Sequence, residues 1–364
     1  MDEIQQMVRE KAKIIRHARR ILIVKPSSMG DIVHAFKAVT LLQQNHPKAV
    51  FDWLVNPAFA ELLDYCPVAI ARKIEFHRKE LGKMTSFLPE FIKLWFNLRK
   101  YKYDLTLDFQ GLLRSAFFAR IARSRHLAGF AAPREEAAAK FYKRKVELPA
   151  DCRQAVQRNL ELAKFYCAEK TLNSPLELPK ISHNVHMARH KLAHRNLNAA
   201  NGLVAIFPGA RWESKVFPAE LYAKLINDLH EKYPQMRFLL LGTINESAAA
   251  CAIARLTGEY VCNMTGATGI GCLVELLRMC KLVVSNDSGP LHLAAILNRP
   301  TIAFYGPTDP GYTGPDGENV KVFQADVPCK NCLKRTCDDA AEKCHVLNYE
   351  QILKTAVYML EGNK

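Results

Sequence analysis

The stretch at residues 283–310 restricts the fold of this chain more than any other part of the sequence. It begins within a short β-branched apolar run, 282–284, which is typical of a buried strand. The turn at 286–290 contains Asn, Asp, Ser, Gly and Pro, residue types that begin helices. Residues 291–297 are helical in composition, and 301–305 form the next expected strand. This order of elements predicts an α/β fold with a parallel sheet.

The turn at 286–290 places a helix N-terminus beyond the carboxyl end of a strand. Backbone N–H groups and the positive end of the helix dipole face that position, so a phosphate group is a natural ligand there. A capped helix in any α/β protein has the same local sequence. Both interpretations remain open for this turn.

Two further segments repeat the order of a strand, a loop of small residues and a helix. They span residues 20–44 and 203–232. No G-x-G-x-x-G pattern follows the first strand, so the dinucleotide-binding fingerprint is absent. A length of 364 residues suggests two domains. We therefore expect two Rossmann-like domains.

The rest of the chain supplies elements that fit this plan. The remaining expected strands are 50–55, 70–71 with 73–76, 103–109 and 237–241, and the remaining expected helices are 59–65, 87–98, 116–122, 154–168, 183–196, 270–279 and 348–360. Strands and helices that alternate in this way predict mainly parallel sheets with right-handed crossovers. A proline-containing linker at 173–179 places the domain boundary near 180–200.

The apolar content argues against a membrane-spanning protein. Hydrophobic residues make up 49% of the chain and charged residues 24%, which is ordinary for a globular protein. No apolar run approaches the ~20 residues that span a bilayer. Residues 2–20 suggest a polar, basic amphipathic helix rather than a signal peptide. We expect a cytoplasmic protein.

The net charge of +15 indicates acidic partners. Nucleic acid, anionic lipid headgroups and phosphorylated small molecules all qualify. The sequence has no zinc-finger spacing and no RNA-binding aromatic signature, so nucleic acid ranks below a phosphorylated substrate or a membrane surface. The basic run at 114–145 is either a solvated face or a surface for an anionic ligand or a membrane.

Several polar residues follow expected strands. Asp31 ends the first loop, where it is either a helix N-terminal carboxylate or a general base. Arg211 and Lys215 offer cations to phosphate oxygens. Glu246 is positioned either to accept hydrogen bonds from ribose hydroxyls or to cap a helix.

Four of the eleven cysteines cluster near the C-terminus. Cys329, Cys332, Cys337 and Cys344 satisfy the ligand count of a zinc site, but their spacing is compact and irregular rather than two C-x-x-C knuckles. Reduced structural thiols or a redox-labile pair therefore rank ahead of metal binding in a cytoplasmic protein. The other seven cysteines are scattered, and most are expected to be small buried hydrophobic residues.

Four motifs extend over nearly the whole chain, in the order KPSSMGDIVHAF, DLTLDFQGLLRSA, PGARWESKVFP and SNDSGPLHLAAILNRPTIAFYGPTDP. Together and in this order they resemble the lipopolysaccharide heptosyltransferase family of glycosyltransferases, family 9. The segment PREEAAAKFYKRKV followed by QAVQRN resembles heptosyltransferase I in particular. The loop PGARWESK departs from that subfamily, which tends to have threonines at the positions of Ala210 and Arg211.

The resemblance implies a GT-B fold, in which two Rossmann-like domains face each other across a cleft. Residues 1–185 would bind the acceptor and residues 195–345 the nucleotide sugar, with the closing helix 348–361 packing back on the first domain. The implied reaction is an inverting transfer of L-glycero-D-manno-heptose from ADP-heptose to the Kdo of the lipid A inner core. It needs no cofactor and no divalent metal. The implied location is the cytoplasmic face of the inner membrane of a Gram-negative bacterium.

The resemblance also implies roles for individual residues. Asp31 would be the catalytic base. The donor-binding residues would be Arg211, Lys215, Glu246, Thr268, Asp287, Ser288, Gly289 and His292. The acceptor-binding residues would be Ser28, Gly30, Gln110, Arg114, Arg120, Arg134, Lys143 and Arg144.

Within the donor set, the resemblance gives each group a task. Lys215, the Ser288 and Gly289 amides and His292 would meet the charge that develops on the leaving ADP. Asp287 would hold sugar hydroxyls and Glu246 the ribose, and the segment around Thr268 would pack near adenine. Arg211 would substitute for the missing threonine hydroxyls.

Three other functions stay open on the sequence. The first is a different enzyme on the same scaffold, such as a transferase for another sugar or an NDP-sugar epimerase, and trials with other nucleotide sugars distinguish it. The second is a non-catalytic nucleotide- or anion-binding protein in which Asp31 is only a helix cap, and it predicts ADP binding without turnover. The third is nucleic-acid binding through the basic face, which predicts a steeply salt-dependent affinity for DNA or RNA.

Overall fold

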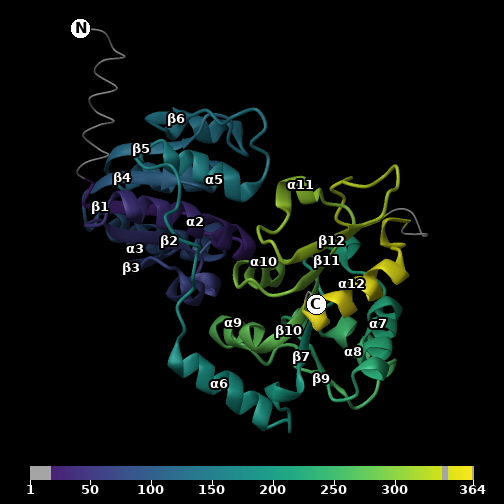
Figure 1. Ribbon diagram of the computed structural model, residues 1–364. Coiled ribbons are helices and arrows are strands. Elements are labelled where there is room, and N and C mark those ends of the chain that lie inside the picture. The colour runs from purple at the N-terminus through teal and green to yellow at the C-terminus, as the bar shows by residue number, and fades with distance from the viewer. Residues whose placement is uncertain (1–17, 338–342, 363–364) are drawn as a thin grey trace. The chain divides into compact units, whose positions relative to one another are not determined.

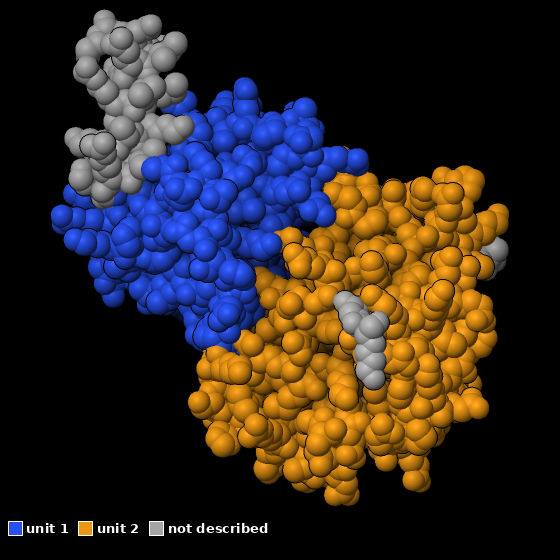
Figure 2. Space-filling model, viewed as in Figure 1, with its two compact units in different colours: residues 1–179 blue, residues 180–364 orange. Residues whose placement is uncertain are grey.

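The structure is a computed structural model that describes residues 18–337 and 343–362. The chain forms two compact units, Met1–Pro179 and Lys180–Lys364 (Figures 1 and 2). The division follows the linker at 173–179, at the start of the boundary region that the sequence predicts. The amphipathic helix predicted for residues 2–20 falls outside the described residues, apart from its last three positions.

The first unit contains a six-stranded parallel sheet. Its strands are β1 (Arg20–Val24), β2 (Val50–Val55), β3 (Ile70–Glu75), β4 (Tyr103–Asp108), β5 (Ser124–Phe130) and β6 (Arg144–Val146), and they lie in the order β3-β2-β1-β4-β5-β6. The connecting helices are α2 (Met29–Asn45), α3 (Met84–Arg99), α4 (Leu113–Ile121) and α5 (Ala155–Lys164), with short 3₁₀ turns at Pro57–Tyr65, Glu80–Gly82 and Glu136–Phe141. This strand order is that of a Rossmann fold.

The second unit repeats the same topology. Its strands are β7 (Leu203–Phe207), β8 (Arg237–Leu240), β9 (Val261–Asn263), β10 (Cys280–Asn286), β11 (Thr301–Tyr305) and β12 (Val320–Gln324), in the order β12-β11-β10-β7-β8-β9. Its helices are α6 (Ser182–Ala193), α7 (Ala219–Lys232), α8 (Ser247–Arg255), α9 (Ile270–Met279), α10 (Gly289–Ile296), α11 (Pro310–Thr313) and α12 (Tyr349–Glu361). In both sheets the strand order reverses beside the first strand of the unit, between β1 and β4 and between β7 and β10.

The central strands are buried on both faces, as their continuous apolar sequences predict. Every residue of β7 and of β11 is buried, and so are the last four residues of β1. Each unit has its own core, which contains Leu22 and Leu54 in the first unit and Val204 and Phe238 in the second. The predicted strands 203–207 and 301–305 and the predicted helix 270–279 have the observed bounds.

The strands β5, β6, β9 and β12 and the helix α8 were not predicted as elements. β5 begins with Ser124, Arg125 and His126 and lies within the basic run. Its apolar second half was therefore too short to give a strand signal in the sequence. Its Gly129 leaves room for the Tyr142 ring, because a Cβ at this glycine would lie 2.4 Å from that ring. Such a contact between distant segments has no local sequence signal.

The closing helix α12 belongs to the core of the second unit. Its implied packing on the first domain stays a prediction. In the structure α12 packs against α7 and β10 of the second unit (Figure 1). Its Ile352 and Ala356 are fully buried in the core of that unit, so α12 stabilises the fold of the second sheet.

Within the described part of the chain, none of the helices combines the length and the apolar character that crossing a membrane requires. This finding agrees with the absence of a long apolar run from the sequence.

Candidate active site

In the first unit, two loops meet where the strand order reverses. β1 and β4 pair in parallel, so the loops that follow them leave the sheet side by side. The Ser27 N–H donates a hydrogen bond to Oε1 of Gln110 at 3.4 Å and joins the two loops. Ligands of open α/β sheets bind at such a reversal, at the carboxyl ends of the strands.

Asp31 lies at this position as the third residue of α2. Its Oδ2 accepts hydrogen bonds from the Ser28 N–H at 2.9 Å and from the Ser28 hydroxyl at 2.8 Å, which caps the helix. Its Oδ1 lies 3.6 Å from Nζ of Lys25, a buried lysine that also donates to the Phe109 carbonyl at 2.9 Å. The Asp31 side chain keeps 38% of its surface exposed. It therefore caps the helix and still presents carboxylate surface to a ligand.

These contacts set the charge state of Asp31. Burial by itself would raise the pKa of this carboxyl group, but the Lys25 ammonium and the two Ser28 donors outweigh burial. The result is an Asp31 pKa well below its usual range. The side chain is therefore an anion at neutral pH, ready to accept a proton but only weakly basic.

A carboxyl group with a depressed folded pKa adds stability that is present above its unfolded pKa and is lost as the pH falls through its folded pKa. Asp31→Asn keeps an oxygen for the Ser28 hydrogen bonds but removes the negative charge beside Lys25 and the helix N-terminus. It should therefore lower stability by about 1 kcal/mol at neutral pH. The difference should stay constant down to about pH 5 and shrink below about pH 4. Urea unfolding of both proteins from neutral to acid pH measures it. A difference that grows on acidification would contradict the depressed pKa.

Five of the eight predicted acceptor residues gather at this edge of the first sheet. Four of them are Ser28, Gly30, Gln110 and Arg114, which lie in the loops after β1 and β4 or in the first turns of α2 and α4. Arg134 joins them, because a Cβ at Gly111 would lie 3.2 Å from its backbone nitrogen. The positive φ of +68° at Gly111 allows this close approach.

The other three predicted acceptor residues lie elsewhere. Arg120 is in the last turn of α4, which runs back toward the amino ends of the strands. Lys143 donates to the carbonyls of Ser124 and Arg125 at 3.1 and 3.2 Å, at the amino end of β5. Arg144 starts β6, and its guanidinium lies over the Phe165 ring. The structure does not bring these three residues together with Asp31.

Asp108, which the sequence analysis did not single out, organises the loop after β4. Its Oδ1 accepts hydrogen bonds from the N–H groups of Gln110 and Gly111, at 2.8 and 3.3 Å. Its Oδ2 accepts the hydroxyls of Ser115 and Tyr142, both at 2.8 Å. The side chain is fully buried, and burial raises its pKa despite these four donors. An aspartate at a strand end was the only signal for it in the sequence.

The second unit has the corresponding position between β7 and β10. Lys215 follows the loop after β7, and its Nζ lies 2.6 Å from Oδ2 of Asp287, which follows β10. Thr308, in the loop after β11, donates its hydroxyl to the same oxygen at 2.6 Å. All three side chains are largely buried. The predicted pair Lys215 and Asp287 is thus in direct contact, and Thr308 is a third member that the sequence analysis missed.

The N-terminus of α10 completes this group. Ser288 is the N-cap residue and Gly289 the first residue of the helix, so their backbone N–H groups lie beside Asp287. His292 is one turn further along, with Nε2 4.0 Å from Oδ1 of Asp287. A lysine, a histidine and a helix N-terminus in one place form a site suited to a phosphate group.

Glu246 and Arg211 border the same edge of the second sheet. Oε2 of Glu246 accepts hydrogen bonds from the N–H and the hydroxyl of Thr243, at 2.6 and 3.0 Å, so this residue does cap a helix. It also packs on the loop after β7, because a Cβ at Gly209 would lie 2.5 Å from the Cβ of Glu246. Arg211 is exposed in that loop, and Thr268 is half-buried in the loop between β9 and α9.

The sequence matches one known protein family over most of its length. The family model for glycosyltransferase family 9 (heptosyltransferase) covers residues 91–342. Lipopolysaccharide heptosyltransferase 1 of Pseudomonas aeruginosa is 32% identical over 324 residues, which are 87% of each chain. This chain belongs to glycosyltransferase family 9.

Two further comparisons agree with the assignment of this chain to glycosyltransferase family 9. Lipopolysaccharide heptosyltransferase 1 of Escherichia coli K12 is 32% identical over 336 residues, which cover 89% of this chain and 98% of the relative. The solved structure of E. coli heptosyltransferase WaaC with ADP has a TM-score of 0.74 and 29% identity, and the match covers 93% of this chain and 99% of that one. The predicted fold class, GT-B with two Rossmann-like domains, is thereby confirmed.

The cysteine-rich tail of this family 9 glycosyltransferase supports the loop that carries Lys215. The Ser214 hydroxyl donates to the Lys334 carbonyl at 2.6 Å, and the Ser214 N–H donates to the Arg335 carbonyl at 3.2 Å. The His345 ring nitrogen Nε2 lies 2.8 Å from the Ser214 carbonyl oxygen and donates to it. No feature of the sequence predicted that this tail would hold the loop around Ser214 in place.

The four tail cysteines do not form a preformed metal site in the structure. No group of three or more His, Cys, Asp or Glu side chains is placed to hold a metal ion in the part of the chain that is described. Cys344 is buried, whereas Cys329, Cys332 and Cys337 are exposed, and the structure joins none of them in a disulfide. Burial and the three neighbouring thiols raise the pKa of Cys344 to about 11. The zinc interpretation stays a prediction that ranks below reduced thiols.

Proposed function

We propose that this glycosyltransferase transfers heptose from ADP-heptose to the Kdo of a lipid A inner core, by an inverting reaction that needs no metal. The relatives with about one third identical residues are named lipopolysaccharide heptosyltransferases 1. The similar WaaC structure holds ADP. The observation that carries the proposal is the contact of Lys215 with Asp287 at the N-terminus of α10, which suits a diphosphate beside a sugar.

The donor end of the reaction belongs to the second unit. Lys215 and the N–H groups of Ser288 and Gly289 bind the diphosphate and stabilise the negative charge that ADP gains as it leaves. His292 is one turn from this position, and Arg211 adds a flexible cation from its exposed loop. Asp287 accepts hydrogen bonds from heptose hydroxyls, Glu246 from the ribose, and Thr268 borders the base.

The acceptor end belongs to the first unit. The Kdo hydroxyl attacks the anomeric carbon of heptose while Asp31 accepts its proton. Attack from the face opposite ADP inverts that carbon. Glycosyl transfer passes through an oxocarbenium-like state, which a weakly basic carboxylate is sufficient to assist. Arg114 and Arg134 lie at the same sheet edge as Asp31 and bind the acceptor's phosphate and carboxylate groups.

A transfer assay tests this proposal. The protein is incubated with ADP-heptose and Kdo–lipid A in excess EDTA, and the mass of the acceptor and the release of ADP are followed. We expect the acceptor to gain one heptose at a rate that the chelator does not change. ADP-glucose and UDP-glucose serve as control donors, and we expect neither to be used.

The other outcomes of this assay are equally informative. ADP binding without turnover would favour a nucleotide-binding protein, in which Asp31 is only the helix cap that its bonds to Ser28 describe. Transfer from another nucleotide sugar would contradict the assignment of ADP-heptose as the donor. A rate that EDTA abolishes and Mg²⁺ restores would contradict the metal-independent reaction.

A further inference from the structure

Four large apolar side chains of α3 lie exposed in one stripe. They are Met84, Leu88, Ile92 and Phe96, with 98%, 61%, 45% and 69% of their surface accessible. A spacing of four residues places them one above another along the helix. A surface helix in a globular protein ordinarily turns such residues toward its core.

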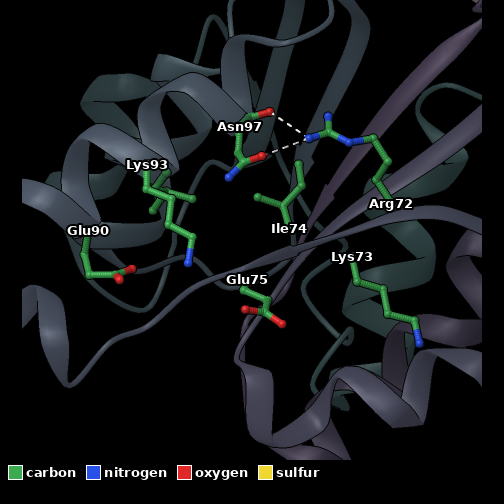
Figure 3. A pocket seen from close by; sticks show the side chains of 8 residues that line it. Arg72, Lys73, Ile74, Glu75, Glu90, Lys93 and Asn97 are labelled. Atoms are coloured by element: carbon green, nitrogen blue, oxygen red, sulfur yellow. Dashed lines mark hydrogen bonds between the residues drawn. The ribbon is translucent and has the colours of Figure 1, made fainter.

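The core does not use this stripe. Leu94 and Leu98 bury the opposite side of α3 in the core of the first unit. Between these two faces, Glu90, Lys93 and Asn97 turn toward β3, where they line a pocket with Arg72 (Figure 3). Asn97 accepts hydrogen bonds from that arginine, through its backbone and side-chain oxygens. The α3 helix is therefore anchored on two faces, and residues 18–337 and 343–362 leave its third, apolar face uncovered.

The uncovered surface continues onto α4 through aromatic contacts. Phe87 stacks on Phe91 with ring centroids 5.6 Å apart, and Phe91 stacks on Phe117 of α4 at 6.4 Å. Phe117 and Leu113 are both exposed on α4. We call Met84, Phe87, Leu88, Ile92, Phe96, Leu113 and Phe117 the apolar face. Contiguous exposed apolar residues on two helices mark an interaction site.

The segment that carries most of the apolar face is strongly basic. Residues 78–102 contain only two acidic residues, and Glu80 already pairs with Lys83 at 3.2 Å. The basic residues of this segment are Arg78, Lys79, Lys83, Lys93, Arg99, Lys100 and Lys102. α4 adds Arg114 and Arg120, both exposed. This charge is complementary to a surface that is itself anionic.

We propose that the apolar face of α3 and α4 inserts into the headgroup region of an anionic phospholipid bilayer, with the surrounding lysines and arginines on the lipid phosphates. Apolar residues on one side of a helix and cations beside them are the features of helices that lie in a membrane interface. The inference deepens the proposed function, because a lipid-anchored acceptor is presented by such a membrane. Its test, however, needs neither donor nor acceptor.

Vesicle flotation with the full chain tests the inference. Vesicles of phosphatidylethanolamine and phosphatidylglycerol at 3:1 are compared with vesicles of phosphatidylcholine alone. We expect the protein to float with the anionic vesicles and not with the neutral ones. The double variant Leu88→Ser/Phe96→Ser should lose at least tenfold in apparent affinity and keep its melting temperature, since both side chains are exposed. Leu256→Ser is the matched control, an exposed leucine of the second unit, and should bind like the wild type.

Fluorescence quenching locates the contact. Trp95 borders the stripe between Phe91 and Arg99. Of the other two tryptophans, Trp53 is fully buried and Trp212 belongs to the second unit. Lipids brominated near the headgroup should quench part of the emission on binding, and Trp95→Phe should abolish this quenching. Quenching that persists in Trp95→Phe would place the membrane contact elsewhere and overturn the inference.

Two other results would also overturn it. Equal binding of wild type and Leu88→Ser/Phe96→Ser to anionic vesicles would remove the apolar face from the contact. A wild-type dimer in light scattering that this variant splits into monomers, without vesicle binding by either protein, would make the face an interface between copies. Because the vesicles lack lipid A, vesicle binding without heptose transfer would contradict only the proposed function.

Discussion

Asp31→Asn is expected to lower kcat for heptose transfer by about 10²- to 10⁴-fold, the range that a positioned general base contributes. ADP should bind with unchanged affinity, because Asp31 lies in the first unit and the phosphate-binding residues lie in the second. Asparagine keeps an oxygen that accepts the Ser28 hydrogen bonds but has no charge with which to take the proton. The variant thus separates the capping role of this residue from its chemistry.

Three measurements decide this prediction. Steady-state transfer gives kcat, calorimetry gives the affinity for ADP, and thermal unfolding shows that the variant is folded. Asp64→Asn is the matched control, since Asp64 also pairs with a lysine, Lys73 at 2.6 Å, but on the surface. A kcat within about threefold of wild type, which is under 1 kcal/mol of barrier, would remove Asp31 from the chemical step.

Lys215→Met is expected to lower kcat by about 10²- to 10³-fold, the cost of removing one preorganised group that stabilises developing charge. The affinity for ADP should also fall, since the same ammonium contacts the ground-state diphosphate. A stability loss should accompany these effects. Asp287 is nearly buried, and without Lys215 its charge loses the ammonium group that lies 2.6 Å away. Breaking a buried ion pair costs up to about 3–5 kcal/mol.

A double variant separates the two consequences of losing Lys215. Lys215→Met/Asp287→Asn removes both charges, so it should regain much of the lost stability but none of the lost activity. Lys321→Met, which removes an exposed lysine of β12, controls for the change in net charge. Recovery of transfer in the double variant would show that Lys215 acts only by neutralising Asp287, and would contradict its role on the leaving ADP.

The positions of the site motifs could be predicted because each motif follows a strong strand signal. The expected strands 20–25, 203–207 and 282–284 contain apolar runs too short for helices, and in a parallel sheet such strands end at the same edge. Residues that come directly after them therefore lie at that edge. This reasoning places Asp31, Lys215 and Asp287 correctly, without any knowledge of contacts.

The same reasoning fails for residues that are far from a strand end. Arg120 and Lys143 belong to a basic run in the sequence, but a helix and a strand separate them from the edge that holds Asp31. A run of basic residues in the sequence does not show at which end of the sheet each of these residues lies. Only the course of α4 and β5 decided that Arg134 reaches Gly111 and that Lys143 binds carbonyls at the other end of the sheet.

The sequence by itself determined the α/β class, the two-domain plan, the family and the positions of Asp31, Lys215 and Asp287, because these depend on local apolar patterns and short motifs. Only the tertiary structure revealed the roles of Lys25, Asp108 and Thr308, the clamp of the tail on Ser214, and the packing of α12 on the second unit. These features are contacts between segments far apart in the chain. They depend on which strands lie next to each other, and local sequence does not encode that order.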